Sequence, residues 1–223
     1  MSNAILSHSA RPRAPTLPAA KRGAAAVLAV WFALVLLLGA SGKFVSPPGT
    51  PPLPILIGVT APIIGFLAGL WMSRSVRELV LTADLRFMMA IQAWRFAGLG
   101  FLALYTHGVL PGLFAWPAGL GDIAIGVSAP WLLVALIRRP SFAASRTFVA
   151  WNVLGILDLV VAVGTGALSS VLATAAAGEI ATGPMAQLPL VLVPAYFVPI
   201  FIMLHVAALL QARRLAKELP RTT

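Results

Sequence analysis

Hydrophobic residues in this chain fall into six long runs, which short polar or proline-rich connections separate. The runs cover residues 24–41, 53–72, 87–105, 113–137, 148–168 and 188–210. An apolar run of about 18 or more residues is typical of a bilayer-spanning helix, because a helix satisfies its own backbone hydrogen bonds. No segment alternates apolar and polar residues with a period of two, so strands are not expected. The pattern predicts an all-α fold, a polytopic transmembrane bundle of six spanning helices.

The composition also indicates a membrane location. Hydrophobic residues make up 60% of the chain and charged residues 10%, and the mean hydropathy is +0.95. A soluble domain is typically about half apolar and about a quarter charged. Leu-Pro pairs at 53–54, 110–111 and 188–189 stand at the start of three of the runs, and we expect each to open a helix, because a proline in the first turn loses no hydrogen bond.

The basic residues lie almost entirely on one side of the predicted bundle. Of the 16 Lys and Arg residues, all except Lys43 and Arg95 precede the first helix, follow the last, or lie in the second and fourth connections. The positive-inside rule therefore predicts that both termini are cytoplasmic. Topology and attraction to anionic lipids at the cytoplasmic face account for the net charge of +10 without nucleic acid.

The ends of the chain are polar. Residues 1–22 hold three prolines among Ala, Ser and Arg, so we expect a disordered, basic cytoplasmic tail. Residues 23–212 form the predicted six-helix transmembrane domain, and residues 213–223 a short basic cytoplasmic tail. The sequence is compatible with a homo-oligomer and identifies no membrane partner.

The chain has no cysteine, which excludes disulfides, thiolate metal sites and thiol nucleophiles. His107 is expected at the outer end of the third helix and His205 in the cytoplasmic half of the sixth. This separation in depth is too large for both to hold one haem iron. We expect each histidine to be an interfacial or packing residue, and no cofactor or metal site is predicted.

Two of the predicted spans contain an aspartate in the same short pattern. Residues 119–126 read GLGDIAIG and residues 155–162 read GILDLVVA, so each aspartate follows a glycine by three residues and precedes a small residue by four. Ala115, Ala129 and Gly166 lie at helical spacing from these small residues, so in each span the small residues form a stripe along one face of the helix. Small residues let membrane helices approach closely, so we expect Asp122 and Asp158 on packing faces.

Arg95 lies near the middle of the third span, and both aspartates lie near the middle of theirs. A charge at a helix centre costs about 2.5–3.5 kcal/mol on insertion scales, so we expect the guanidinium to pair with at least one carboxyl. The second carboxyl then either holds a proton or shares the arginine. The candidate proton or ion site is Arg95, Asp122 and Asp158, together with the polar side chains of Gln92 and Asn152.

Gly119-Leu120-Gly121-Asp122 resembles the GxGD signature of the intramembrane aspartyl proteases. The resemblance implies a catalytic pair of Asp122 and Asp158. The chain departs from that family, because Leu157 rather than tyrosine precedes Asp158, and the order of the two helices is reversed. The family's Pro-Ala-Leu element has only residues 194–196, Pro-Ala-Tyr, as a counterpart.

The phrases QAWRFAGLGFL, LPGLFAWPAGLGD and WNVLGILDL resemble those of small multi-pass bacterial inner-membrane proteins of unassigned activity. The resemblance covers the third to fifth helices and implies a location in the bacterial cytoplasmic membrane.

Three functions are consistent with these features. The favoured one is transport of a small molecule coupled to a proton or cation at the Arg95, Asp122 and Asp158 site. In the second, a subunit, sensor or assembly protein uses the same residues only as a polar staple between helices. The third is intramembrane proteolysis, the one enzymatic function among the three; it is disfavoured because Arg95 at the same depth opposes a proton shared between two acids.

Overall fold

The computed structural model describes residues 17–176 and 178–218, and within them it contains six helices long and apolar enough to cross a membrane. Four are continuous: α1 (Leu17–Ala40), α2 (Leu53–Met72), α6 (Gly112–Arg138) and α7 (Arg146–Leu172). The third span consists of α4 (Leu85–Gln92), the 3₁₀ segment η1 (Ala93–Gly98) and α5 (Leu99–Thr106). The sixth consists of the π-helical segment η4 (Val193–Phe197) and α8 (Val198–Glu218). The predicted all-α transmembrane bundle of six spanning helices is confirmed.

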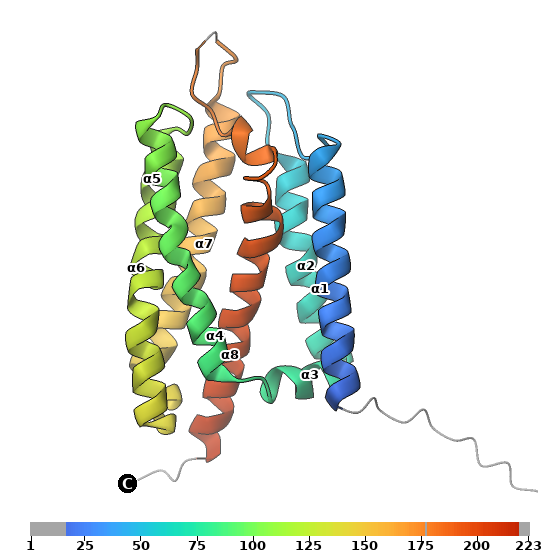
Figure 1. The fold of residues 1–223 in the computed structure, drawn as a ribbon, viewed down its shortest axis with the longest axis vertical. Coiled ribbons are helices and arrows are strands. Elements are labelled where there is room, and N and C mark those ends of the chain that lie inside the picture. Colours follow the sequence, from blue (N-terminus) through green and yellow to red (C-terminus); the bar gives the residue numbers. More distant parts are fainter. Residues whose placement is uncertain (1–16, 177, 219–223) are drawn as a thin grey trace, which may run out of the picture.

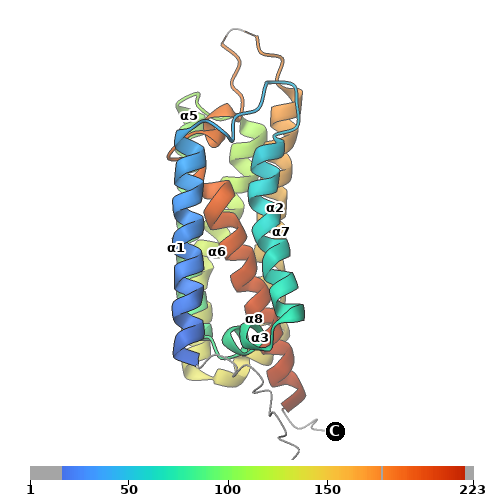
Figure 2. The ribbon, with the colours of Figure 1, turned by 90° about the vertical axis from the view of Figure 1, so that its right-hand side faces the viewer.

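The helices run up and down along one axis, and the beginning of α1 and the end of α8 lie at the same end of the bundle (Figure 1). Figure 2 shows α1 and α2 on either side of α8. The remaining helices pack on one another in order: η1 packs on α6, α6 packs on α7, and α7 packs on α8. The end with the second and fourth connections, called the arginine-rich end, carries Arg74, Arg77, Arg86, Arg138, Arg139, Arg146, Arg213 and Arg214.

A short amphipathic helix that the apolar runs do not predict, α3 (Arg74–Leu81), crosses the arginine-rich end (Figure 1). It begins where the side chain of Ser73 accepts a hydrogen bond from Val76 N at 3.3 Å. Its far end is fixed to α8, because Gln211 Nε2 donates to Val80 O at 2.7 Å and to Ala83 O at 2.9 Å. The second connection is therefore a structured element that joins α2 to the third span.

Prolines open two helices as expected, since α2 follows Pro52 with a further proline in its first turn, and α6 follows Pro111. The prediction for Leu188-Pro189 is wrong. This pair has a cis peptide bond and lies in turns, and the helix begins only at Val193. The hydrogen bonds of Leu192 N to Pro189 O and of Val193 N to Leu190 O close these turns before the helix starts.

The first and the last helix of the chain are longer than expected. Residues 17–22, assigned to the N-terminal tail, are helical because α1 begins at Leu17, and residues 213–218 belong to α8. Residues 1–16 and 219–223, the remainder of the two predicted tails, lie outside the described residues.

The largest apolar cluster fills the half of the bundle nearest the arginine-rich end. It includes Met89 from α4, Ala129 from α6, Phe148 from α7 and Ala208 from α8, all fully buried. The stripe of small residues on α6 packs inward, as predicted, with Ala115, Gly119, Gly126 and Ala129 buried. This close packing on small residues brings both η1 and α7 against α6.

Candidate functional site

Arg95 is carried by η1, the irregular middle of the third span, and its side chain points into the bundle with only 2% of the residue exposed. The backbone of η1 lies directly on α6 at Gly126. A side chain at Gly126 would stand closer than 3.0 Å to the backbone at Arg95 and Phe96, so only glycine permits this approach. The sequence thus brings the arginine to the contact between α6 and α7.

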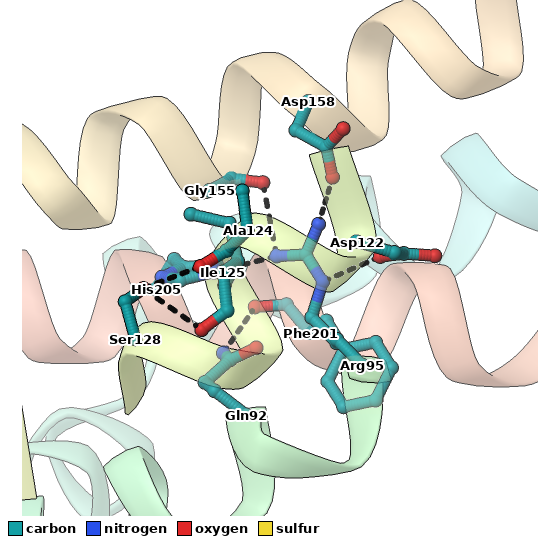
Figure 3. A network of polar contacts seen from close by, with 10 residues as sticks. All are labelled: Gln92, Arg95, Asp122, Ala124, Ile125, Ser128, Gly155, Asp158, Phe201 and His205. Carbon is teal, nitrogen blue, oxygen red and sulfur yellow. Dashed lines mark hydrogen bonds and ion pairs between the residues drawn. The ribbon is translucent and has the colours of Figure 1, made fainter. Parts of the chain in front are cut away.

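Arg95 joins the two predicted aspartates, as Figure 3 shows. Its Nε donates to Asp122 Oδ1 of α6 at 2.6 Å, and its Nη2 donates to Asp158 Oδ2 of α7. Both contacts are salt bridges, so one guanidinium binds two carboxylates from two helices. Charge-assisted hydrogen bonds of this kind are the strongest polar contacts in proteins.

The remaining nitrogen, Arg95 Nη1, donates to Gly155 O at 3.3 Å and lies 3.2 Å from His205 Nε2 of α8 (Figure 3). A guanidinium has no acceptor, so His205 Nε2 has to accept this hydrogen bond. The proton of the ring therefore lies on Nδ1, which is 2.9 Å from Asn152 Oδ1 and donates to it. His205 is neutral in this arrangement, and it links α8 to the third span and to α7.

His205 was expected to be an interfacial or packing residue in the cytoplasmic half of its helix; it is buried and packed, but the expected position in the cytoplasmic half is wrong. The residue is fully buried, at the level of Arg95, and belongs to the same hydrogen-bonded network. Its ring also packs edge-on against Trp151 with a centroid distance of 5.4 Å. His107, in contrast, is exposed and follows the end of α5, as predicted.

The two predicted amide residues lie at the edge of the network. Asn152 is fully buried and reaches Arg95 only through His205, while its Nδ2 donates to Phe148 O at 2.9 Å. Gln92 is also fully buried, but its Nε2 donates to Phe201 O at 3.5 Å (Figure 3). Among the described residues, Gln92 Oε1 has no hydrogen-bond partner.

Glycines make the space that the two carboxyl groups occupy. A side chain at Gly121 would meet the carboxyl group of Asp158, and a side chain at Gly98 would meet Asp122 Cβ, in both cases closer than 3.0 Å. Gly119 packs in the same way against Leu102 of α5. Both glycines of the GxGD sequence therefore have a packing role at the contacts of α6 with α5 and α7.

The network contains one positive and two negative groups, with a neutral histidine. The Arg95 side chain is completely buried, whereas the side chains of Asp122 and Asp158 keep 15% and 11% of their surface exposed. A proton or cation that enters the bundle therefore meets a carboxyl group rather than the guanidinium.

Two cavities border Asp122, and most of their lining residues lie in the half of the bundle opposite the arginine-rich end. The first, which we call the vestibule, has a volume of about 90 Å³; it lies between α2, α6 and α7, and its lining includes Phe44, Ile55, Gly166 and Thr182. The second, which we call the lateral cavity, has a volume of about 480 Å³ and lies between the third and sixth spans. Its lining includes Trp94, Leu104, Phe197 and Phe201, with Arg95 and Asp122 at its inner wall.

The two cavities share the side chains that separate them, Phe101, Asp122 and Val193. Trp94 and Phe197 of the lateral cavity are 72% and 40% exposed on the outside of the bundle, so this cavity opens toward lipid. Toward the arginine-rich end, the buried cluster around Met89 and Phe148 fills the space between the helices.

The fold and this buried ionic network define a multi-pass membrane protein with a charged centre inside its helix bundle. The chain belongs to the family described as Domain of unknown function (DUF8737), which matches residues 52–213. This segment holds every residue of the network, and α1 lies outside it. Comparisons with curated proteins and with solved structures find no match.

Proposed function

We propose that the protein is a small-molecule carrier of the bacterial cytoplasmic membrane, and that Arg95, Asp122 and Asp158 form the site at which it binds a coupling proton or cation. The observation that supports this most strongly is a single guanidinium bound to two partly exposed carboxyl groups. Ionisable residues inside the apolar part of a membrane protein commonly mark proton or ion pathways.

The charge balance of the network supports proton or cation exchange. With both carboxylates ionised and His205 neutral, one negative charge is left over after pairing with Arg95. In a low-dielectric interior an uncompensated charge is costly, and one bound proton or monovalent cation removes it. Binding and release of that charge is the step that would be coupled to transport.

The accessibility of the site supports a carrier that is open on one side. The arginine-rich half is packed, whereas both cavities border Asp122 and have most of their lining residues in the opposite half. Under the positive-inside rule this is the half of the bundle nearer the outside of the cell. The two spans that flank the lateral cavity are interrupted by η1 and η4, and such 3₁₀ and π segments are frequent at hinges and functional sites.

The two alternatives receive less support. A purely structural staple explains the pairing of Arg95 with Asp122 and Asp158, but not why two cavities extend to Asp122. An aspartyl protease uses two carboxyls that share a proton, whereas here each carboxyl is bound to Arg95. We therefore propose transport rather than catalysis.

Infrared spectroscopy of the purified protein tests the proposed proton site directly. A protonated carboxylic acid has its own carbonyl stretching band, and beside the bands of the exposed acids we expect one, from the buried pair, that appears and disappears reversibly with pH. Asp122→Asn or Asp158→Asn should remove or shift it, and Glu179→Gln, at an exposed loop position, should leave it unchanged.

Proteoliposomes provide the second half of this test. Under an imposed pH gradient we expect the parent protein to exchange protons in the presence of its substrate, and both asparagine variants to lose this exchange. The structural staple would be established instead by two results together. The parent would show neither a titrating band nor proton exchange, and the asparagine variants would lose folded protein until Arg95 is also neutralised.

A further inference from the structure

The network itself indicates the sign of the charge that a substrate carries. Every nitrogen of the Arg95 guanidinium already donates to a partner within the bundle: Nε to Asp122, Nη1 to Gly155 O and His205, and Nη2 to Asp158. The guanidinium is also completely buried. The nitrogens of Arg95 are therefore all used in contacts within the bundle, and no pair of N–H donors is left to bind an anion. Asp122, in contrast, borders both cavities.

The lining of the lateral cavity indicates the chemical class of the substrate. Apart from Arg95 and Asp122, its walls are apolar and include the aromatic rings of Trp94, Phe197 and Phe201. Cations bind favourably over aromatic faces, and the Arg95 guanidinium itself lies 5.8 Å from the centre of the Phe201 ring. A cavity of about 480 Å³ is in the size range of sites for drug-sized ligands.

A hard metal ion fits this cavity poorly. Ions such as Mg²⁺ and Ca²⁺ require about six or more oxygen ligands. The lateral cavity offers a single carboxylate, and among the described residues no group of three or more His, Cys, Asp or Glu is placed to hold a metal ion. An organic cation needs only one counter-charge, because its apolar groups contact the walls.

We infer that the substrate is a lipophilic organic cation, such as a hydrophobic amine or quaternary ammonium compound, which enters the lateral cavity from the bilayer and pairs with Asp122. This inference rests on the proposed function and adds the substrate class to it. The exposure of Trp94 and Phe197 on the outside of the bundle provides the entry from lipid.

The separate vestibule gives the coupling proton its own path. The vestibule and the lateral cavity meet at Asp122, on either side of Phe101 and Val193. When a monovalent cation pairs with Asp122, one proton leaves the network through the vestibule to water, so the net charge of the network and its ligand is unchanged. Proton and organic cation therefore compete for the same negative charge.

Two probes of nearly identical shape and opposite charge test this inference. The protein is placed in lipid nanodiscs, and binding of tetraphenylphosphonium and of tetraphenylborate is measured, with empty nanodiscs subtracted. We expect saturable binding of tetraphenylphosphonium, release of about one proton per bound cation in weakly buffered solution, and binding that weakens as the pH falls. Saturable binding of tetraphenylborate alone, or equal binding of both, would overturn the inference.

Variants locate the binding position. Asp122→Asn should abolish saturable binding of tetraphenylphosphonium. Because that variant also changes the network, the cavity wall gives an independent test. Trp94→Leu, on the lipid-facing rim, should weaken binding about tenfold, a loss between those expected for an exposed and for a fully desolvated cation–π contact. Trp131→Leu is the matched control, since Trp131 is 67% exposed on α6 and does not line the cavity.

The outcomes separate the inference from the proposed function. If tetraphenylphosphonium does not bind while the carboxylic acid band of the parent still titrates and depends on Asp122, the inferred substrate class is wrong, but the proposed proton site is still supported. If the cation binds and Trp94→Leu has no effect, the lateral cavity is not the binding position. If it binds in the lateral cavity without releasing a proton, coupling to a proton is wrong.

Discussion

His205 Nε2 accepts a hydrogen bond from Arg95 Nη1 across a distance of 3.2 Å, although the two residues are 110 positions apart in the chain. The contact joins α8 to η1 at the centre of the bundle. It fixes the ring proton on Nδ1, where it is donated to Asn152 Oδ1. The contact therefore defines a protonation state that spectroscopy can detect.

We expect nitrogen NMR of the protein labelled at its histidine rings to show His205 as the neutral Nδ1–H form. Since Arg95 can only donate, the doubly protonated ring would lose this hydrogen bond and place two positive groups side by side. The exposed His107 gives a reference signal for a ring at the bundle surface. A spectrum in which His205 is the Nε2–H form would contradict the geometry described for the network.

Replacement of His205 by phenylalanine should destabilise the protein although an aromatic ring is kept beside Trp151. The change leaves Asn152 Oδ1 and one N–H group of Arg95 without their partner, and a buried unsatisfied polar group costs about 1–3 kcal/mol. His107→Phe, at an exposed position, should change the stability by less than about 0.5 kcal/mol. Thermal unfolding of the purified variants in the same detergent measures both values, and equal stabilities would show that the histidine contacts contribute little.

The six helices could be predicted from the sequence because length and apolarity alone decide whether a segment spans a bilayer. The mid-membrane levels of Arg95, Asp122 and Asp158 followed from the same runs, since a helix rises by roughly 1.5 Å per residue. Depth and the small-residue stripes were enough to predict that these three side chains lie near each other. The partners of each guanidinium nitrogen required the structure.

The role of His205 could not be predicted because the ends of its helix were misplaced. The apolar run at 188–210 puts the histidine in the cytoplasmic half, but the spanning helix occupies Val193–Glu218, and its middle falls next to His205. The polar residues at the end of α8 interrupt the apolar pattern, so the pattern did not predict that the helix continues beyond residue 210. The interruption at η1 had only a weak signal, because Ala93–Gly98 contains no proline and its single glycine is the last residue, and the close approach to Gly126 arises only in the tertiary structure.

Removal of the guanidinium should be more damaging than removal of the whole ionic network. Arg95→Met leaves two carboxyl groups inside the bundle without their common partner, and breaking a buried pair in this way costs about 3–5 kcal/mol. In the triple variant that also carries Asp122→Asn and Asp158→Asn, no charge remains, and we expect most of the lost stability to return. The yield of folded protein and its thermal unfolding measure the difference; a triple variant no more stable than Arg95→Met would contradict it.

The side of the membrane on which each connection lies follows from the distribution of arginine. Reporter fusions after residues 46, 108 and 176, in the three connections at the end opposite the arginine-rich end, should all report the outer side. Fusions after residues 84 and 145 should report the cytoplasm. A cytoplasmic signal at residue 108 would be inconsistent with six spans in this orientation.

Two glycines on α7 allow the packing of the network to be tested with the same substitution in the same helix. A side chain at Gly155 would stand closer than 3.0 Å to the ring of His205, which cannot move freely because Arg95 and Asn152 hold it. At Gly164 no atom lies within 4 Å of the added carbon. Gly155→Ala should therefore lower the stability by about 1–3 kcal/mol through overpacking.

Gly164→Ala should leave the stability unchanged or raise it slightly, because alanine has the higher helix propensity. Comparison of the two unfolding temperatures in one detergent removes the common effect of the substitution, so the difference measures the contact between α7 and the His205 ring. Two variants of equal stability would mean that α7 can move away from α8 at little cost, and that the close contact of Gly155 with the His205 ring does not hold the two helices in a fixed arrangement.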